Sequence, residues 1–192
     1  MKLPLAGRTI LIGVCGSIAA FRAADLVSRL FQAGAGVTVL MTRSARRFVT
    51  PLTFQTLSHR GVITGLWDPE ATDPEHIQLA RGAHGYLIAP ATANVLGKLA
   101  GGIADDAVTT TALAVTCPLI VAPAMNTLMW EHPAVRANVD LLQRRGVIVV
   151  PPEAGRLACG TVGPGRLAST DRLYAAVTQA TGAAGAGRLR KV

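Results

Sequence analysis

The fold is decided by the stretch TILIGVCGSIAAFRAADLVSRLFQAG (residues 9–34), in which the spacing of apolar side chains changes once. Thr9–Val14 is continuously apolar, which predicts a short strand buried on both faces. Apolar residues then recur three and four apart from 18 to 33, which predicts a helix that ends at Gly34. A buried strand that leads directly into a helix is the first half of a βαβ unit.

The same alternation continues along the rest of the chain. Four more short apolar runs predict strands at 37–41, 86–89, 119–122 and 147–150. Further helices are expected at 44–48, 53–58, 76–81, 95–115, 133–145 and 171–181, and a glycine-rich loop is expected at 155–165. Strands joined by helical crossovers form a parallel sheet, so we expect a single-domain, doubly wound α/β fold of the Rossmann or flavodoxin-like type, flanked by helices. Such folds bind ligands beyond the C-terminal ends of their strands.

Length and composition fit one globular domain and narrow the class of ligand. The chain has 192 residues, of which 50% are hydrophobic and 16% charged, and its net charge is +8. Only 4% are aromatic, which argues against a stacking platform for nucleic acid. The positive charge therefore favours a phosphorylated small molecule, and we expect no nucleic-acid partner. The domain is predicted to span 1–181, followed by a basic Gly/Ala-rich tail at 182–192.

The N-terminal residues and the three cysteines indicate the cellular compartment of the protein. Residues 1–20 resemble a signal peptide, but Arg8 interrupts the apolar stretch, and we interpret it as the first strand of the fold. No apolar run reaches the roughly 18 residues of a membrane span. Cys15, Cys117 and Cys159 lack a CxxC spacing, so they predict neither a disulfide scaffold nor a zinc site. We expect a cytoplasmic protein with no metal site and no membrane partner.

Small and polar residues follow the first two predicted strands. Gly16 and Ser17 come after the first strand, and Thr42 and Ser44 come after the second. Backbone N–H groups and hydroxyls at a positive helix end can hold a phosphate. The same residues can equally form a tight turn and cap helices, and the sequence leaves both interpretations open.

The third and fourth strands are also followed by candidate ligand contacts. Ala91, Thr92 and Asn94 could let a flat ring approach the backbone and offer it polar groups. Asn126 and Met129 lie in a segment where apolar neighbours surround an amide, a setting that can bind a carboxylate while excluding water. Both segments also have a purely structural interpretation. The one after the third strand could be a capped loop, and the one after the fourth could be an Asx turn beside core methionines.

Two further residues are candidates for proton chemistry. Cys159 lies in the predicted glycine-rich loop, where a flexible lid could carry a reactive thiol, although a buried small residue is the alternative. His76 begins a predicted helix, and a lone histidine there can also be a cap or a surface group.

Five segments, in order, match one family. They are GSIAA (16–20), HIQLA (76–80), APATANVLGKLAGGIADD (89–106), PAMNTLMW (123–130) and LACGTVGPGR (157–166). On these motifs the chain resembles the homo-oligomeric flavin-containing cysteine decarboxylases, over residues 9–166. Within that family it is most similar to the members that act on 4'-phosphopantothenoylcysteine.

The resemblance implies FMN as the cofactor and a role for each candidate residue. FMN is expected to be bound by Gly16, Ser17, Thr42, Ser44, Ala91, Thr92 and Asn94. His76 is expected to act as acid or base, Asn126 to hold the substrate carboxylate, and Cys159 to supply a proton late in the reaction. Substrate contacts are expected from Asn126, Met129, Ala158, Cys159 and Gly160.

The resemblance also implies a reaction and an assembly. The expected reaction is decarboxylation of 4'-phosphopantothenoylcysteine to 4'-phosphopantetheine in coenzyme A biosynthesis, through a thioaldehyde and an enethiolate. A homotrimer or dodecamer is expected, with FMN at a subunit interface. The tail at 182–192 would be either a linker to a fused phosphopantothenate-cysteine ligase domain or the end of a single-function enzyme.

Three other functions share this fold. A peptidyl-cysteine decarboxylase would use the same flavin on another substrate. A related prenyltransferase that builds a modified flavin would carry different residues where this chain has PAMN. A non-catalytic FMN-binding regulatory subunit would lose catalytic residues, whereas this chain has His76, Asn126 and Cys159 together.

Overall fold

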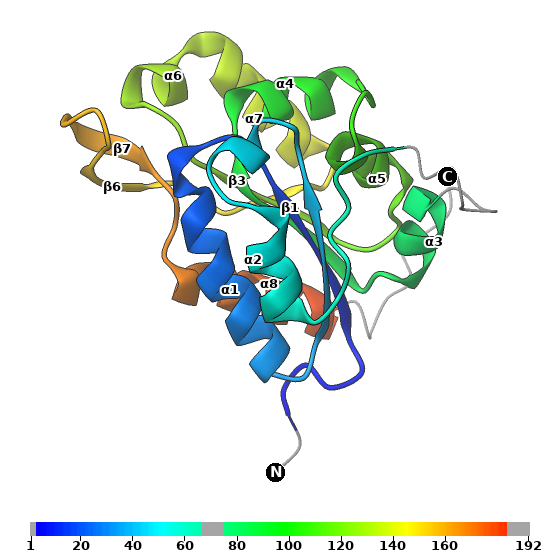
Figure 1. The fold of residues 1–192 in the computed structure, drawn as a ribbon. Helices are drawn as coiled ribbons and strands as arrows, with labels where there is room; N and C mark the ends of the chain where they lie inside the picture. The colour runs from blue at the N-terminus through cyan, green and yellow to red at the C-terminus, as the bar shows by residue number, and fades with distance from the viewer. Residues whose placement is uncertain (1–2, 67–74, 184–192) are drawn as a thin grey trace.

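A five-stranded parallel sheet forms the centre of the molecule (Figure 1). The computed structural model describes residues 3–66 and 75–183. The sheet order is β2-β1-β3-β4-β5, with strands β1 (Thr9–Val14), β2 (Gly36–Met41), β3 (Gly85–Ala91), β4 (Leu119–Pro123) and β5 (Ile148–Val149). This is the flavodoxin-like order, in which a crevice opens between β1 and β3 because the chain changes direction across the sheet there. The predicted doubly wound α/β fold is therefore confirmed.

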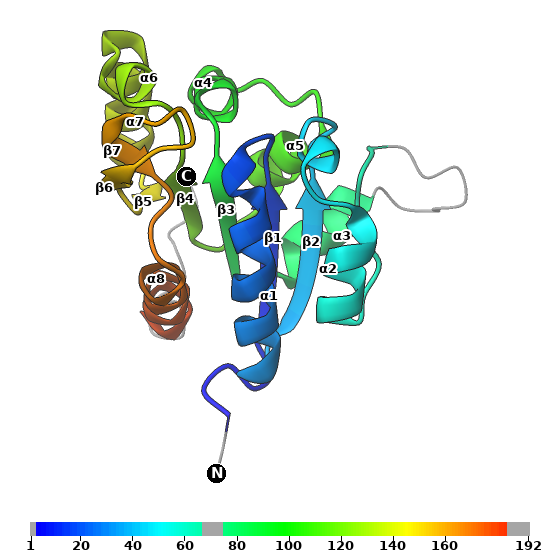
Figure 2. The same cartoon turned by 60° about the vertical axis from the view of Figure 1, so that its left-hand side comes forward.

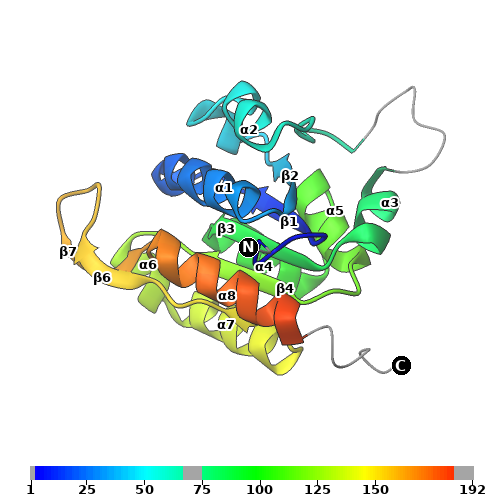
Figure 3. The same ribbon diagram turned by 90° about the horizontal axis from the view of Figure 1, so that it is seen from below.

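Helices cover both faces of this sheet, as Figure 2 and Figure 3 show from two further directions. One face packs against α1 (Arg22–Gln32), α2 (Pro51–Ser58) and α8 (Thr170–Ala183). The other face packs against α4 (Ala93–Gly101), α5 (Ala107–Ala114) and α7 (Pro133–Arg144). The remaining helical segments are η1 (Ile18–Phe21), η2 (Ala45–Arg47), α3 (Glu75–Gly82) and α6 (Thr127–Glu131).

Strand β1 shows why an unbroken apolar run became the central strand. Ile10 and Ile12 point into the core on the α1 side, whereas Leu11 points into the core on the α5 side. All three side chains are fully buried. A strand with helices on both faces cannot alternate apolar and polar residues, because neither face meets water.

Two predicted elements differ in the structure. The helix predicted at 95–115 is broken into α4 and α5, because Gly102 takes a left-handed conformation (φ 70°) and Asp106 starts a new helix with a capping box to Thr109. The loop predicted at 155–165 is largely an antiparallel hairpin, β6 (Glu153–Arg156) and β7 (Val162–Arg166), which projects from the body beside α6 (Figure 1).

Some expectations lie partly outside the described residues. Helix α8 continues to Ala183, slightly past the predicted domain end at 181, and residues 184–192 of the predicted tail are not described. Within 3–66 and 75–183, no helix combines the length and apolar character needed to cross a membrane. Over the same ranges, no three His, Cys, Asp or Glu side chains come together in a way that could hold a metal ion.

The buried Tyr86 hydroxyl joins the sheet to α5. It donates a 3.0 Å hydrogen bond to the Val108 carbonyl, directly over Gly13, where any Cβ would lie 2.9 Å from the tyrosine oxygen. We expect Tyr86→Phe to lower the free energy of unfolding by about 1 kcal/mol, because the buried carbonyl loses a partner. Urea denaturation measures this. Tyr174→Phe is the matched control, with an expected change below about 0.5 kcal/mol, because that ring is only half-buried. Equal effects of the two substitutions would contradict the role assigned to the Tyr86 hydroxyl.

Candidate functional site

Two adjacent cavities lie at the C-terminal ends of the strands, where a doubly wound sheet places its ligands. The first has a volume of about 570 Å³ and the second about 470 Å³. Ser17, Ala124 and Met125 line both cavities, so the residues that follow β1 and β4 form their common wall.

The first cavity brings together residues from four separate segments of the chain. Most of the residues predicted to bind FMN line it, together with charged residues that were not predicted. Its lining consists of Gly16, Ser17, Thr42, Arg43, Ser44, Thr92, Ala93, Asn94, Val95, Lys98, Asp105, Asp106, Ala124, Met125 and Met129. Ala91 is the exception among the predicted FMN contacts, because it is fully buried at the end of β3, opposite Pro123.

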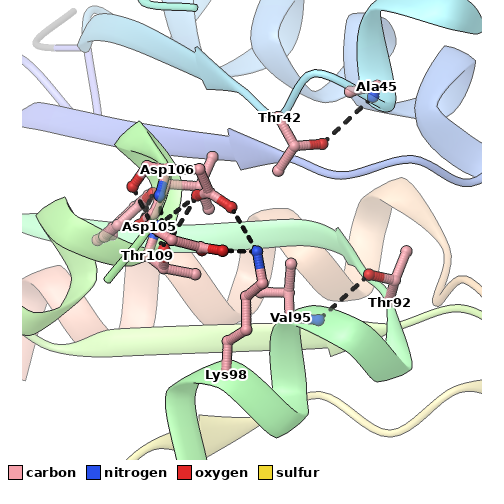
Figure 4. A network of polar contacts seen from close by, with 10 residues as sticks. Thr42, Ala45, Thr92, Val95, Lys98, Asp105, Asp106 and Thr109 are labelled. Atoms are coloured by element: carbon pink, nitrogen blue, oxygen red, sulfur yellow. Dashed lines mark hydrogen bonds and ion pairs between the residues drawn. The ribbon is translucent and has the colours of Figure 1, made fainter. Parts of the chain in front are cut away.

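The hydroxyl groups of the first cavity also cap the segments that follow each strand. Ser17 accepts a hydrogen bond from the Ala19 N–H, and Thr42 accepts one of 3.2 Å from the Ala45 N–H. Thr92 caps α4 by accepting from Val95 N–H at 3.4 Å, and Figure 4 shows the last two contacts. The capping interpretation is confirmed for Ser17, Thr42 and Thr92 but not for Ser44, whose side chain makes no cap hydrogen bond. Capping is compatible with ligand binding, because all four residues line the cavity.

Close contact of two backbone segments shapes one end of this cavity. A Cβ at Gly16 would overlap the Ser44 Cβ, so only glycine lets the turn after β1 lie against the segment after β2. Arg43, next to Ser44, lines the cavity and forms no ion pair with the described residues. This end therefore offers hydroxyls and an unpaired cation, which suits a phosphate.

A charged cluster occupies another part of the lining (Figure 4). The Lys98 Nζ lies 2.6 Å from an Asp105 carboxylate oxygen and 3.2 Å from one of Asp106. The hydrogen bond to Asp105 raises the pKa of Lys98, and the same bond lowers the pKa of Asp105. One cation and two carboxylates carry a net charge of −1, so this part of the cavity does not suit the phosphate.

The second cavity is formed by the β6–β7 hairpin folding against the loops after β1 and β4. The Met125 N–H donates to the Gly165 carbonyl at 3.0 Å, and the Thr127 hydroxyl donates to the Pro164 carbonyl at 2.8 Å. The cavity is lined by Ser17, Ile18, Ala19, Phe21, Arg22, Ala124, Met125, Asn126, Arg156, Leu157, Ala158, Cys159, Gly165, Arg166 and Leu167. No carboxylate stands among these described lining residues.

Asn126 and Cys159 meet in the second cavity, although 33 residues separate them in the sequence. The Asn126 Nδ2 lies 3.3 Å from the Cys159 Sγ, and the Asn126 Oδ1 accepts a 2.8 Å hydrogen bond from the Leu128 N–H. The Asx turn suggested by the sequence is therefore present, and it orients the amide N–H groups toward the thiol and the cavity.

The remaining predicted site residues have different outcomes. Ala158 lines the second cavity, whereas Gly160 forms the tip of the hairpin turn (φ 87°) without lining it. Met129, predicted to contact substrate, lines the first cavity. His76 belongs to α3, and its side chain lies outside the described residues, so its role stays a prediction.

Sequence reasoning missed the charged and apolar groups that complete both cavities. Lys98, Asp105 and Asp106 lie inside a recognised motif, but only the tertiary structure shows that they line a cavity. The Asp106–Thr109 capping pattern was the available signal for the start of α5, which positions Asp105 and Asp106. Phe21 was assigned to a helix, yet its side chain is 62% exposed and lines the second cavity.

A family model described as Flavoprotein matches residues 2–182. The chain belongs to the Flavoprotein family. Its similarity to the coenzyme A biosynthesis bifunctional protein CoaBC of Bacillus subtilis (strain 168) is 49% identity over 170 residues, which cover 88% of this chain and 42% of that protein. The chain thus spans less than half the length of this relative.

Solved structures of Flavoprotein-like proteins superpose closely on this one. The FMN-dependent cysteine decarboxylase SpaF has a TM-score of 0.84 and 35% identity, with 95% of this chain and 99% of that chain covered. A Cys-to-Ser mutant of PPC decarboxylase complexed with pantothenoylaminoethenethiol has a TM-score of 0.80 and 34% identity. The match covers 90% of this chain and 97% of that chain. Both likenesses extend over nearly the whole described domain.

The three cysteines of this family member are expected to differ in reactivity. Hydrogen bonds from Thr161 lower the pKa of Cys159, whose thiol is exposed. Burial raises the pKa of Cys15 to about 12 and that of Cys117 to about 11. Because only thiolates react readily, iodoacetamide at neutral pH should label Cys159 first, as peptide mass spectrometry would show. The other two cysteines are internal controls, and faster labelling of either would contradict the site geometry.

Proposed function

We propose that this chain is an FMN-dependent decarboxylase that converts 4'-phosphopantothenoylcysteine to 4'-phosphopantetheine in coenzyme A biosynthesis. The observation that carries this proposal is the contact between Asn126 and Cys159 in the second cavity, which shares a wall with the phosphate-compatible first cavity. The names of the relatives support it, since one is a coenzyme A biosynthesis protein and another is PPC decarboxylase. The protein would act in the cytoplasm.

The first cavity fits FMN. The Gly16–Ser44 contact forms a cradle, and the hydroxyls of Ser17 and Thr42 with the cation of Arg43 would hold the phosphate. Thr92 and Asn94 would contact the ring, with Ala93 rather than Ala91 as the small residue that faces it. The SpaF structure, described as FMN-dependent, supports the choice of cofactor.

Loss of CO2 from an amino-acid carboxylate needs an electron sink beside it. The chemistry that bound FMN would supply is a reversible two-electron oxidation of the substrate thiol to a thioaldehyde, which can accept the electron pair left on carbon when the bond to CO2 breaks. The second N–H of Asn126 would hold the substrate carboxylate, because its first N–H contacts Cys159 and its oxygen is occupied.

Cys159 would supply a proton for the last stage of the reaction. The enethiolate that remains after CO2 leaves needs a proton on carbon, and the Cys159 S–H would donate it and recover a proton from solvent. The product thiol also requires the two hydrogens that the initial oxidation removed, which is chemistry that bound FMN would supply. Ile18, Phe21 and Leu157 line the same cavity and would exclude water from the substrate. His76 would act as an acid or base.

The exposed apolar side chains around the cavities favour a shared active site. Phe21 is 62% exposed and Leu128 is 78% exposed, and Phe21 lines the second cavity. A second copy of the chain would cover such side chains, which supports a homotrimer or dodecamer with FMN at the subunit interface. The match covers only 42% of the bifunctional relative, so a phosphopantothenate-cysteine ligase domain is the partner that this relative suggests.

A peptidyl-cysteine decarboxylase is the second candidate. The likeness to the structure of the peptidyl-cysteine decarboxylase EpiD, with a TM-score of 0.74 and 26% identity, supports it as the alternative. Both candidates use the same cofactor cavity, so only the substrate distinguishes them.

The function is tested by mixing the purified yellow protein with 4'-phosphopantothenoylcysteine and following the products by mass spectrometry. We expect loss of one CO2 to give 4'-phosphopantetheine. Cys159→Ser should still release CO2 but accumulate the enethiol, which is lighter by two hydrogen atoms, because the proton donor is gone. Conversion only of a peptide that ends in cysteine would replace the proposed function with the alternative. No conversion of either substrate would contradict both.

The cofactor cavity is tested separately. Gly16→Ala places a methyl group against Ser44, so we expect the purified variant to contain much less FMN while remaining folded. Gly61→Ala is the matched control, because a Cβ there meets no atom within 4 Å. Flavin absorbance relative to protein absorbance measures the difference. Equal flavin content in the two variants would place the cofactor elsewhere.

A further inference from the structure

The environment of the Cys159 thiol contains a group to which the resemblance assigned no role. Besides Asn126, the sulfur contacts the Thr161 hydroxyl, with 3.1 Å between Sγ and Oγ1. The hairpin turn creates this contact, because Gly160 has a left-handed backbone (φ 87°) and the Leu157 N–H donates to the Thr161 carbonyl at 2.8 Å. The turn thereby places Thr161 on the same side as the thiol.

The two neighbours of the sulfur differ in what they can do. Asn126 can only donate to it, because the amide oxygen already accepts from the Leu128 N–H and the Nδ2 faces the thiol. A threonine hydroxyl can donate or accept, and rotation about one bond changes its role. The Thr161 hydroxyl has no other hydrogen-bond partner within the described part of the chain, so it is free to rotate.

This difference matters for a group that must hold a proton and then release it. A protonated Cys159 needs an acceptor for its S–H, and Asn126 cannot provide one. A deprotonated Cys159 is stabilised by every donor that points at it. Among its side-chain neighbours in the described residues, only the Thr161 hydroxyl can serve both states.

We propose that the Thr161 hydroxyl is a positioning group for proton transfer from Cys159, accepting from the S–H before transfer and donating to the sulfur afterwards. The proposal rests on the proposed function, because it assigns Thr161 a part in the proton-donating step. The shift in the pKa of Cys159 agrees with the proposal. That pKa is lowered, and the hydrogen bond from the Thr161 side chain is the largest cause.

Other charges face the same cavity and must be kept constant in any test. Arg22 from α1, Arg156 from β6 and Arg166 from β7 line it together with Cys159. Arg166 is paired with Glu153 at 3.0 Å, and Arg22 donates to the Leu167 carbonyl at 3.2 Å. Substitution of Thr161 changes none of these groups, so a change in thiol reactivity would report the hydroxyl itself.

The test compares Thr161→Val, which keeps the branched shape without the hydroxyl, with Thr161→Ser, which keeps the hydroxyl. The rate of iodoacetamide labelling at Cys159 is measured against pH in the flavin-loaded protein. We expect Thr161→Val to shift this profile to higher pH and slow labelling at neutral pH by about fivefold, the effect of one lost hydrogen bond. Thr161→Ser should match the wild type. With 4'-phosphopantothenoylcysteine, Thr161→Val should also accumulate the enethiol.

Two results would overturn the inference. A Thr161→Val profile equal to that of the wild type would show that the hydroxyl does not act on the thiol. An equal slowing in Thr161→Val and Thr161→Ser would assign the effect to the shape of the hairpin. The labelling needs no substrate, so failure of the wild type to release CO2 would reject the proposed function without obscuring this result.

Discussion

The backbone hydrogen bond between the Met125 N–H and the Gly165 carbonyl joins the hairpin to the sheet, and the arrangement of the site depends on it. Gly165 allows this contact, since a side chain there would collide with the Met125 carbonyl. The hydrogen bond from Thr127 to Pro164 strengthens the same junction. Without this junction, Cys159 would have no fixed position relative to Asn126, and the second cavity would lose a wall.

The sheet supplies the other half of the arrangement. Because β1 lies between β2 and β3, the segments that follow these strands meet at one crevice, and α4 adds its first turn to it. Neutral hydroxyls and Arg43 occur in one part of the first cavity, and the Lys98 cluster occurs in another. The lining therefore has a polarity that matches a molecule with a phosphate at one end and a neutral ring at the other.

Much of this could be predicted from the sequence, for identifiable reasons. Strands β1 to β4 appear where apolar runs predicted them, because a strand buried on both faces needs an unbroken run. The predicted strand at 147–150 is reduced to the partly exposed β5 at the edge of the sheet. The break at Gly102 was missed because apolar spacing continues across it, although the Asp106–Thr109 pattern marked a new helix start. The hairpin was missed because it is stabilised by backbone pairing between its strands and by hydrogen bonds from Met125, after β4, and from the Thr127 hydroxyl of α6, rather than by an apolar pattern. For the site, most of the residues that directly follow strands line the two cavities, whereas Ala91 is buried instead. The Thr161–Cys159 contact depends on a turn that the sequence pattern does not reveal.

The two cavities have only Ser17, Ala124 and Met125 in common, and this small overlap gives the architecture a modular character. Most of the described lining of the second cavity comes from the hairpin and from η1, so exchange of the hairpin alone would replace a large part of it. Such an exchange would leave the residues around the phosphate-compatible cradle untouched. Evolution can therefore alter which molecule enters the second cavity while the first cavity is inherited unchanged, and a designer could graft new hairpins onto the same sheet for the same reason.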